Sequence, residues 1–518
     1  MGGYLLGYDV GSSSIKATLL SIDNGKAVTS ATSPDRELEI QAPRPGWAEQ
    51  NPEVWWEHLL KATEKIASSG VKLADVEAIG ISYQMHGLVC LDRAGVILRP
   101  AIIWCDSRAV EIGDKAFADL GPDRCLEKLL NSPGNFTASK LAWVRENEPE
   151  IFASIDRILL PGDYIAYRLT GTLNTTPSGL SEGILWNFAE GRLADFLLEY
   201  YGIAEKMIPP LVANFAVQGE VSAEAATQLG LKAGTPVSYR GGDQPNNALS
   251  LNVLQPGEVA ATAGTSGVVY GVGDTPGYDS ASRVNTFVHV NHEQGSPRYG
   301  TLLCINGTGI LNSWLKHNLM TQQGTAPATG GAERGVRASG ERASGVSYEQ
   351  MNALAASIPV GADGLVVLPY GNGAERTLEN RNIGASIRGL DLNRHGQAHL
   401  LRAAQEGIVF ALKYGLQIME GMGLRIDRVR AGAANMFLSP LFAEAFATIS
   451  GAAVELYDTD GSQGAARGAG IGVGIYDLEG AFSGLKQVRV VEANADLADP
   501  YEEAYQRWLK ELQRILSG

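Results

Sequence analysis

The sequence has few cysteines and histidines and no cluster of either type. Its four cysteines and seven histidines are scattered over 518 residues, without the short spacings that structural metal sites require. Few, scattered cysteines in a large chain indicate reduced thiols, so we expect a cytoplasmic protein. The chain also lacks a basic segment at its beginning and any apolar run long enough to cross a bilayer. We therefore expect neither export nor membrane insertion.

Positive charge is scarce as well. The 42 lysines and arginines are outnumbered by 57 aspartates and glutamates, which gives a formal net charge of −15. A nucleic-acid-binding surface needs the opposite balance, so this composition argues against a nucleic acid as partner. It remains compatible with a nucleotide ligand that is held mainly by backbone amides and a metal ion.

Several common enzyme motifs are absent or incomplete. No GxxxxGK[ST] sequence occurs, which disfavours a Walker-type kinase. Residues 468–474 are glycine-rich but lack the GxGxxG spacing, so we predict a closely packed helix there and disfavour an NAD-dependent oxidoreductase. Residues 179–183 fit the GxSxG pattern of serine hydrolases, but no strand precedes them and no helix clearly follows. We interpret this match as chance.

The length and apolar content predict two domains. A chain of 518 residues is too long for one ordinary domain, and its 45% hydrophobic residues can fill two cores. The Gln-Pro-Gly turn at residues 255–257 is our candidate boundary, so the predicted domains are residues 1–254 and 255–518. Residues 321–345, rich in Gly, Ala, Thr and Ser, are predicted to be an exposed, mobile loop.

Each predicted domain opens with a strand, a Gly/Ser turn and a returning strand. The first turn is residues 11–14 and the second is residues 264–267. Alone, the first turn is more typical of a plain hairpin, although the backbone amides of such turns can also bind an anion. The repeat favours phosphate binding at both turns. It predicts a duplicated α/β fold with the ligand between its halves.

Residues 240–247, Arg-Gly-Gly-Asp-Gln-Pro-Asn-Asn, place a carboxylate between two glycines and a predicted helix. The glycines let the backbone bend and let another molecule approach closely. Asp243 has two interpretations. Aspartate is a favoured helix N-cap, and proline suits the first helical turn. Alternatively, Asp243 is a general base positioned for proton transfer.

Two more polar positions follow predicted strands. Asp9 lies near the end of the first strand, and residues 84–87, Gln-Met-His-Gly, follow a strand at residues 76–82. Polar side chains at strand ends are where α/β folds bind ligands. Taken singly, Asp9 is more typical of a strand-end turn and His86 of a buried core histidine.

The order of these motifs resembles that of the FGGY carbohydrate kinases, and within them the xylulokinases. Residues 9–16 and 263–267 resemble the two phosphate loops of this family, and residues 242–244 resemble the segment with its catalytic base. Residues 84–87 resemble the xylulokinase sugar-binding element, where glycerol kinases carry an Arg-Glu pair. The resemblance covers residues 4–475.

This resemblance implies an α/β protein with the two-domain actin/hexokinase/Hsp70-like fold, a ribonuclease H-like fold with duplicated βββαβα cores and a cleft between them. It implies ATP-dependent phosphorylation of D-xylulose to D-xylulose 5-phosphate. Asp243 would be the general base, and Asp9 and Asp243 would position Mg²⁺. The sugar would contact Met85, His86, Gly87 and Asp243. The implied ATP-binding residues are Gly11, Ser12, Ser13, Lys16, Gly264, Thr265, Ser266, Gly267, Gly432, Ala433 and Asn435.

The sequence also departs from the family pattern. The nucleotide-site turn, usually glycine-rich, is Ala-Gly-Ala-Ala at residues 431–434, and Ser12 stands where threonine is common. Residues 245–247, Pro-Asn-Asn, replace small residues after the base, which can alter sugar choice. Two signature stretches of the family match residues 137–147 and 386–406.

Alternatives remain open at the level of sequence. One is another FGGY kinase, acting on L-ribulose, L-fuculose, gluconate or glycerol. Another is a catalytically silent nucleotide- or sugar-binding sensor, against which the presence of both Asp9 and Asp243 argues. The exact sugar, any regulator and the oligomeric state, with a homodimer as one option, are not determined by the sequence.

Overall fold

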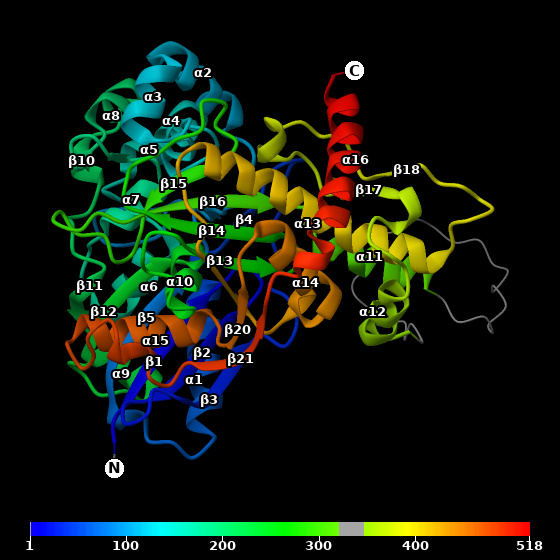
Figure 1. Cartoon of the computed structure of the whole chain (residues 1–518). Helices are drawn as coiled ribbons and strands as arrows, with labels where there is room; N and C mark the ends of the chain where they lie inside the picture. Colours follow the sequence, from blue (N-terminus) through cyan, green and yellow to red (C-terminus); the bar gives the residue numbers. More distant parts are fainter. Residues whose placement is uncertain (1, 321–345, 518) are drawn as a thin grey trace, which may run out of the picture.

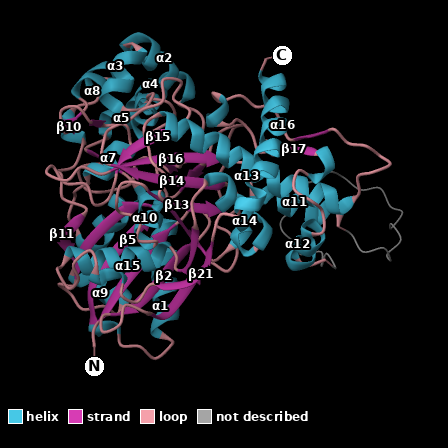
Figure 2. Cartoon of the chain, in the orientation of Figure 1, coloured by secondary structure: helices cyan, strands magenta, loops and turns pink. Residues whose placement is uncertain are grey.

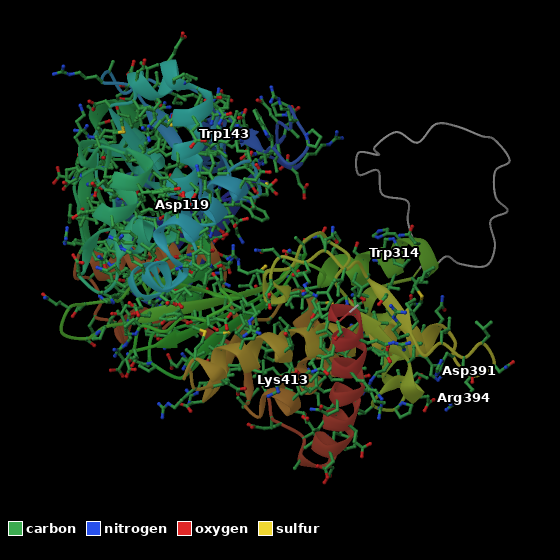
Figure 3. All side chains as sticks on the ribbon, turned by 90° about the horizontal axis from the view of Figure 1, so that it is seen from above. Asp119, Trp143, Trp314, Asp391, Arg394 and Lys413 are labelled. Carbon is green, nitrogen blue, oxygen red and sulfur yellow. The ribbon has the colours of Figure 1, made fainter. Side chains whose placement is uncertain are left out.

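In the computed structural model the chain forms two halves, each built around one large β-sheet (Figures 1 and 2). The structure describes residues 2–320 and 346–517. The loop predicted at residues 321–345 lies outside the described residues. Figure 3 shows Asp119 and Trp143 on the first half, and Lys413, Asp391 and Arg394 on the second.

The first half contains a six-stranded sheet with the order β11-β12-β5-β1-β2-β3. Strands β1, β2 and β3 form an antiparallel meander, β5 and β12 continue the sheet in parallel, and β11 closes it as an antiparallel edge. In the register of β1 and β5, Asp9 lies opposite Ser82. The strand bounds are β1 (Tyr4–Val10), β2 (Ile15–Ser21), β3 (Ala27–Ser33), β5 (Val76–Tyr83), β11 (Phe215–Glu220) and β12 (Pro236–Gly242).

The second half repeats this plan in a seven-stranded sheet, β15-β16-β14-β13-β19-β20-β21. Again an antiparallel meander is followed by two parallel strands and an antiparallel edge, with β15 added at the other side. The strand bounds are β13 (Glu258–Ala263), β14 (Gly267–Gly273), β15 (Asn285–Val288), β16 (Tyr299–Ile305), β19 (Arg428–Gly432), β20 (Val454–Asp458) and β21 (Lys486–Val491). The predicted duplication is therefore present in the strand order itself.

Helix α15 (Gly461–Gly472) comes from the second half but covers the first sheet, where it contacts β1, β5 and β12 (Figure 1). The approach is close because both surfaces carry small residues. A Cβ atom on Gly7 would stand 1.9 Å from the Ser462 carbonyl oxygen, and one on Gly80 would stand 1.9 Å from that of Ala465. The helix predicted around residues 468–474 is thus present and closely packed.

The predicted boundary after residue 254 separates the two sheets along the chain, but not the helices that cover them. Helix α10 (Asp243–Ser250) follows the first sheet and contacts α15, β13 and β14. The Asn246 side chain donates a hydrogen bond of 2.8 Å to the Gly461 carbonyl oxygen. The exact domain division stays a prediction, and α10 with α15 connects the two halves.

The remaining helices follow the predicted periodicity where the apolar spacing is clear. In α1, for example, Asn51 caps the helix, Pro52 occupies its first position, and one face packs on β2 and β3. The helix bounds are α1 (Pro52–Ala67), α2 (Val110–Leu120), α3 (Pro122–Leu129), α4 (Thr137–Asn147), α5 (Pro149–Ser154), α6 (Pro161–Thr170), α7 (Pro177–Glu182), α8 (Asp195–Tyr201), α9 (Ala223–Leu229), α11 (Gly309–Leu319), α12 (Tyr348–Ala356), α13 (Gln397–Gly421), α14 (Pro440–Ser450) and α16 (Ala498–Leu516).

Short strands complete the fold, and one of them differs from expectation. The strand predicted at residues 101–104 ends at Ile102, which leaves Trp104 outside it with 52% of its surface exposed. The short strands are β4 (Glu49–Gln50), β6 (Val89–Leu91), β7 (Ala101–Ile102), β8 (Arg157–Leu159), β9 (Trp186–Asn187), β10 (Arg192–Leu193), β17 (Val366–Leu368) and β18 (Ser386–Arg388).

Candidate active site

Asp9 lies near the end of β1, where its carboxylate is held by the neighbouring strand. The Ser82 hydroxyl donates a hydrogen bond of 2.8 Å to Asp9 Oδ1. The carboxylate also lies against the beginning of α15, since a Cβ on Gly461 would stand 2.5 Å from Asp9 Oδ2. Burial raises the pKa of Asp9, against the lowering effect of the Ser82 hydrogen bond. The strand register thus fixes the direction of this acid.

Asp243 is the first residue of α10, and the N-cap position belongs to Gly242. The N-cap interpretation of Asp243 is therefore wrong by one position, because the preceding glycine occupies the cap. Burial raises the pKa of Asp243 to about 7, and the charge of Asp9 adds to the rise. The two acids predicted to act together therefore lie close enough to repel each other.

His86 has a left-handed backbone conformation, with φ of 62°. Its Nδ1 atom lies 2.9 Å from the Glu182 carbonyl oxygen, and its ring packs edge-on against Phe136 at 4.8 Å between centroids. A carbonyl oxygen can only accept, so Nδ1 carries the proton. Burial lowers the pKa of His86 to about 3, so the ring is neutral at physiological pH. Nε2 is then left as a hydrogen-bond acceptor.

Met85 and Gly87, on either side of His86, are fixed by packing. Met85 is buried against Gly242, where an added Cβ would stand 2.7 Å from Met85 Cγ. A Cβ on Gly87 would stand 2.5 Å from Pro161 Cγ. The predicted sugar-binding element therefore contacts the turn that carries Asp243, which brings these predicted residues together.

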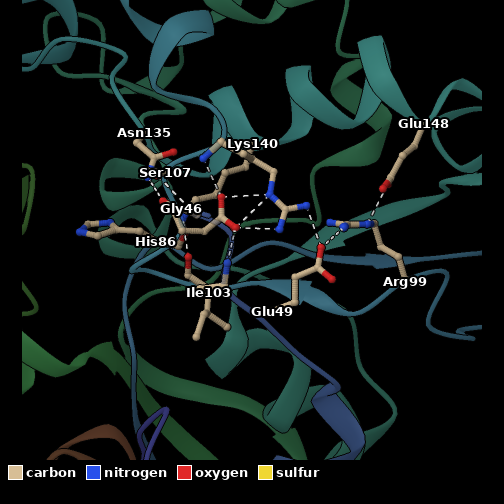
Figure 4. Close-up of polar contacts among 12 residues, drawn as sticks. Gly46, Glu49, His86, Arg99, Ile103, Ser107, Asn135, Lys140 and Glu148 are labelled. Carbon is tan, nitrogen blue, oxygen red and sulfur yellow. Dashed lines mark hydrogen bonds and ion pairs between the residues drawn. The ribbon is translucent and has the colours of Figure 1, made fainter. Parts of the chain in front are cut away.

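Lys140 of α4 holds two segments of the candidate site in place, and the sequence reasoning missed it (Figure 4). Its buried ammonium donates hydrogen bonds to the carbonyl oxygens of His86 at 2.8 Å and Ile103 at 3.0 Å. Burial lowers the pKa of Lys140 to about 8. One side chain thus fixes the backbone of His86 and the segment that leads to Trp104.

Behind this lysine, a buried charge network supports residues 103–108 (Figure 4). Arg108 forms ion pairs with Asp106 and Glu49, each at 2.7 Å. Arg99 forms ion pairs with the same Glu49 at 2.5 Å and with Glu148 at 2.8 Å. Removing one member of such a network leaves an uncompensated charge in the interior. The many charged residues that follow β7 in the sequence could have indicated this network.

Trp104 is a second residue that the sequence reasoning did not place in the site. Its indole Nε1 donates a hydrogen bond of 3.2 Å to the Ser12 hydroxyl in the first Gly/Ser turn. An exposed aromatic ring beside a candidate phosphate turn offers a flat apolar surface to a ligand. A lone tryptophan before Cys105 gave no such indication in the sequence.

The two Gly/Ser turns are held differently. In the first, the Gly11 amide donates to the Ser14 carbonyl at 3.0 Å, and Lys16 pairs with Asp460 at 2.6 Å. Gly11 and Lys16 therefore already have partners within the protein. The amides of Ser12 and Ser13 have no partner among the described residues, which leaves them available to an anion.

In the second turn, the carbonyl groups are bonded to the start of α11. Gly264 and Thr265 accept hydrogen bonds from the amides of Gly309 at 2.9 Å and Ile310 at 3.2 Å. At the other end of the turn, a Cβ on Gly267 would stand 2.6 Å from Thr308 Oγ1. With its carbonyls engaged, the turn leaves its amide groups for an anion.

A cavity of about 640 Å³ lies beside the second turn. Three of the residues predicted to bind ATP line it, namely Gly264, Thr265 and Asn435, whereas Gly432, Ala433, Ser266 and Gly267 do not. Helices α11 and α12 supply much of the remaining wall, and the sequence reasoning did not include them. The volume is in the range of ligand pockets.

The GxSxG match at residues 179–183 has no catalytic geometry. It lies in and directly after α7, and the Ser181 hydroxyl donates to the Ser178 carbonyl at 2.7 Å and accepts from the Val288 amide at 2.9 Å. Both hydrogen bonds are buried, so this hydroxyl is not exposed as in a nucleophile elbow.

Two negative findings apply to residues 2–320 and 346–517. No group of three or more His, Cys, Asp or Glu side chains is arranged to hold a metal ion. In the same part of the chain, no helix combines the length and apolarity that crossing a membrane requires.

Comparisons with known proteins cover almost the whole chain. The N-terminal domain of the FGGY family of carbohydrate kinases matches residues 4–250, and its C-terminal domain matches residues 259–472. The xylulose kinase of Bacillus subtilis is 30% identical over 82% of this chain and 79% of its own length. That of Escherichia coli is 30% identical over 90% and 88%.

A solved structure shows the same fold. The structure titled as a xyloylose kinase from Brucella ovis aligns over 99% of both chains with a TM-score of 0.86 and 26% identity. Together with the two repeated sheets, this confirms the expected two-domain actin/hexokinase-like fold class.

Proposed function

Because this chain belongs to the FGGY family of carbohydrate kinases, we propose that it phosphorylates a pentulose, converting D-xylulose to D-xylulose 5-phosphate. ATP-dependent phosphorylation of a sugar follows from the family. The choice of D-xylulose is supported by residues 84–87 and by the relatives named xylulose kinase. The single observation that carries the mechanism is the pair of partly buried acids, Asp9 and Asp243, at one site.

Asp243 accepts the proton of the terminal sugar hydroxyl as that oxygen attacks the γ-phosphorus. A pKa of about 7 suits this role, because a general base works best when its pKa is near the ambient pH. Phosphoryl transfer otherwise needs in-line positioning and neutralisation of charge rather than covalent help. The fixed position of Asp243 at the first residue of α10 supplies the positioning of the base.

The sugar is held on the side of the first sheet. Neutral His86 offers Nε2 as an acceptor for a sugar hydroxyl, while Met85 and Gly87 shape the wall beside it. Lys140 keeps the backbone of His86 in its left-handed conformation. The exposed ring of Trp104 is hydrogen-bonded to Ser12 in the first Gly/Ser turn.

ATP is held on the side of the second sheet. The cavity beside Gly264, Thr265 and Asn435 takes the nucleoside, and the amides of the two Gly/Ser turns take the phosphates. Lys16 is paired with Asp460, so its proposed contact with phosphate requires that this ion pair open or be shared.

The acids Asp9 and Asp243 fit Mg²⁺, which takes one or two carboxylates and keeps much of its hydration when it binds together with phosphates. When bound, Mg²⁺ neutralises charge on the phosphates. The Ser82 hydrogen bond would hold the Asp9 carboxylate ready for such an ion.

A coupled ADP-release assay over a panel of ketopentoses, polyols and aldonates tests the substrate. We expect the highest kcat/KM for D-xylulose. Equal or higher kcat/KM for L-ribulose, gluconate or glycerol would reassign the sugar within the family. Loss of ADP release for every panel member, in a protein that still binds ATP, would instead indicate the silent sensor.

A further inference from the structure

Glu182 is a buried acid to which the proposed mechanism gives no role. It is the last residue of α7, and only 2% of the residue's surface is exposed. Neither carboxyl oxygen has a hydrogen-bond partner among the described residues. Leaving buried polar atoms unpartnered is costly, so such atoms in a folded protein indicate a missing water or ligand.

The surroundings of Glu182 belong to the candidate sugar site. A Cβ on Gly242 would stand 2.7 Å from Glu182 Oε2, as close as it would stand to Met85 Cγ. The carboxyl therefore lies against the turn that carries Asp243 and beside the side chain of Met85. Its own carbonyl oxygen meanwhile accepts the Nδ1 proton of His86. Glu182 thus contacts each segment to which the sugar is assigned.

We propose that Glu182 is a specificity-determining residue that binds a hydroxyl of the acceptor sugar other than the one that is phosphorylated. This inference rests on the proposed function. A sugar hydroxyl both donates and accepts hydrogen bonds, so it can satisfy an oxygen that the protein leaves unpartnered. A site built to hold one hydroxyl rejects an analogue that lacks it much more strongly than an apolar pocket does.

The surroundings of Glu182 disfavour its charged form. Burial raises the pKa of Glu182 well above its ordinary value, the neighbouring Tyr83 hydroxyl lowers it, and the charges of Asp243 and Asp163 add to the rise. A carboxyl oxygen of Glu182 can accept a hydrogen bond from a sugar hydroxyl whether or not the acid is protonated. The Tyr83 hydroxyl lies beside it, yet no hydrogen bond of ordinary geometry joins the two groups.

The test compares the full-length enzyme with Glu182→Leu and Glu182→Gln. We would measure kcat/KM for the best ketopentose and for its deoxy analogues, each lacking one hydroxyl other than the reacting one. For the parent, we expect kcat/KM to be at least about tenfold lower with one analogue than with the intact sugar, which is the scale of one hydrogen bond to an acidic group. In Glu182→Leu, kcat/KM for the intact sugar should fall to the value that the parent shows for that analogue. Removing the same hydroxyl from the sugar should then lower kcat/KM of the variant no further. Glu182→Gln, which keeps a donor and an acceptor, retains part of the discrimination.

A matched control and a folding readout make the result specific. Glu150 lies on α5, none of whose residues is buried, so Glu150→Leu should leave every value unchanged. We expect the KM for ATP and the melting temperature of Glu182→Leu to remain near those of the parent. Equal losses for all sugars and for ATP would show a structural role and overturn the inference.

The remaining outcomes separate this inference from the proposed function. If Glu182→Leu discriminates among the deoxy analogues as the parent does, this inference alone fails. If Glu182→Leu does not fold, the test rests on the parent enzyme. A parent whose kcat/KM falls less than tenfold for every deoxy analogue refutes a role for Glu182. A parent that phosphorylates no ketopentose overturns the proposed function, and this inference with it.

Discussion

The two strand–turn–strand units that open the halves share a backbone plan and differ in charge. In the first, Asp9 precedes the turn and Lys16 follows it, whereas Thr262 and Val268 take the corresponding places in the second. Backbone amides can hold a phosphate at either turn. A carboxylate for proton transfer is needed only beside the reacting hydroxyl. The duplication therefore repeats the backbone turn that we propose to bind phosphate and leaves the acids on one side.

The largest expected effect comes from removing the proposed base on the charged side. In Asp243→Asn the side chain keeps its shape but cannot accept the sugar proton, so turnover should fall by at least about a hundredfold. ATP affinity should change little, because the cavity and second turn belong to the other half. Turnover, ATP affinity and melting temperature are measured beside the parent. Near-normal turnover in a folded variant would contradict the assigned mechanism.

The second turn can be displaced by a substitution that changes no charged residue. A Cβ in Gly309→Ala would stand 2.2 Å from the Gly264 carbonyl oxygen, so the turn must move away from α11. Displacements on this scale can cost up to about a hundredfold in rate, and we expect at least about a tenfold rise in the KM for ATP. The KM for the sugar should change much less. Gly421→Ala, with no atom within 4 Å of the added Cβ, is the matched control.

Replacing Lys140, which lies on the sugar side, should have an effect of intermediate size. Lys140→Met removes both hydrogen bonds and leaves the carbonyls of His86 and Ile103 without this partner. Each buried group left unpartnered costs about 1–3 kcal/mol of stability. We expect a lower melting temperature and, because His86 is no longer held in position, a rise of about tenfold in the KM for the sugar, the scale of one hydrogen bond to a charged donor.

The KM for ATP separates the two possible explanations of the Lys140→Met result. If it stays near the parent value, Lys140 acts by positioning His86 and Trp104. If it rises by the same factor as the KM for the sugar, the variant has lost general folding rather than the sugar side. Lys128→Met, on α3 with an exposed pair to Glu190, controls for the loss of a lysine.

How much the sequence could predict depended on whether a role was local. Asp9, Asp243 and the two turns could be predicted because strand ends and glycines mark them within a few residues. Lys140 was missed because its partners lie 54 and 37 residues away, and no local pattern shows which carbonyl an ammonium will reach.

The same limit applies to helix packing and to strained backbone. The small residues of α15 predicted a closely packed helix, but not that it would cover the sheet of the other half. The left-handed conformation of His86 was likewise invisible, because it depends on the hydrogen bonds at its carbonyl and ring. The N-cap of α10 was misplaced by one residue because both glycine and aspartate suit that position.

The smallest expected effect is an absence of titration at His86. Its pKa of about 3 lies far below the value of about 6.5 for an exposed histidine. Between about pH 5 and pH 8 the ring therefore stays neutral, and sugar affinity should show no inflection near pH 6.5. The unfolded chain binds a proton in this interval that the folded one does not, so the free energy of unfolding should decrease as the pH falls below about 6.5. Sugar binding is measured by calorimetry on Asp243→Asn, which lacks the proposed base. An inflection near pH 6.5 that disappears when His86→Gln is added would show that His86 does titrate, contrary to its buried and neutral state.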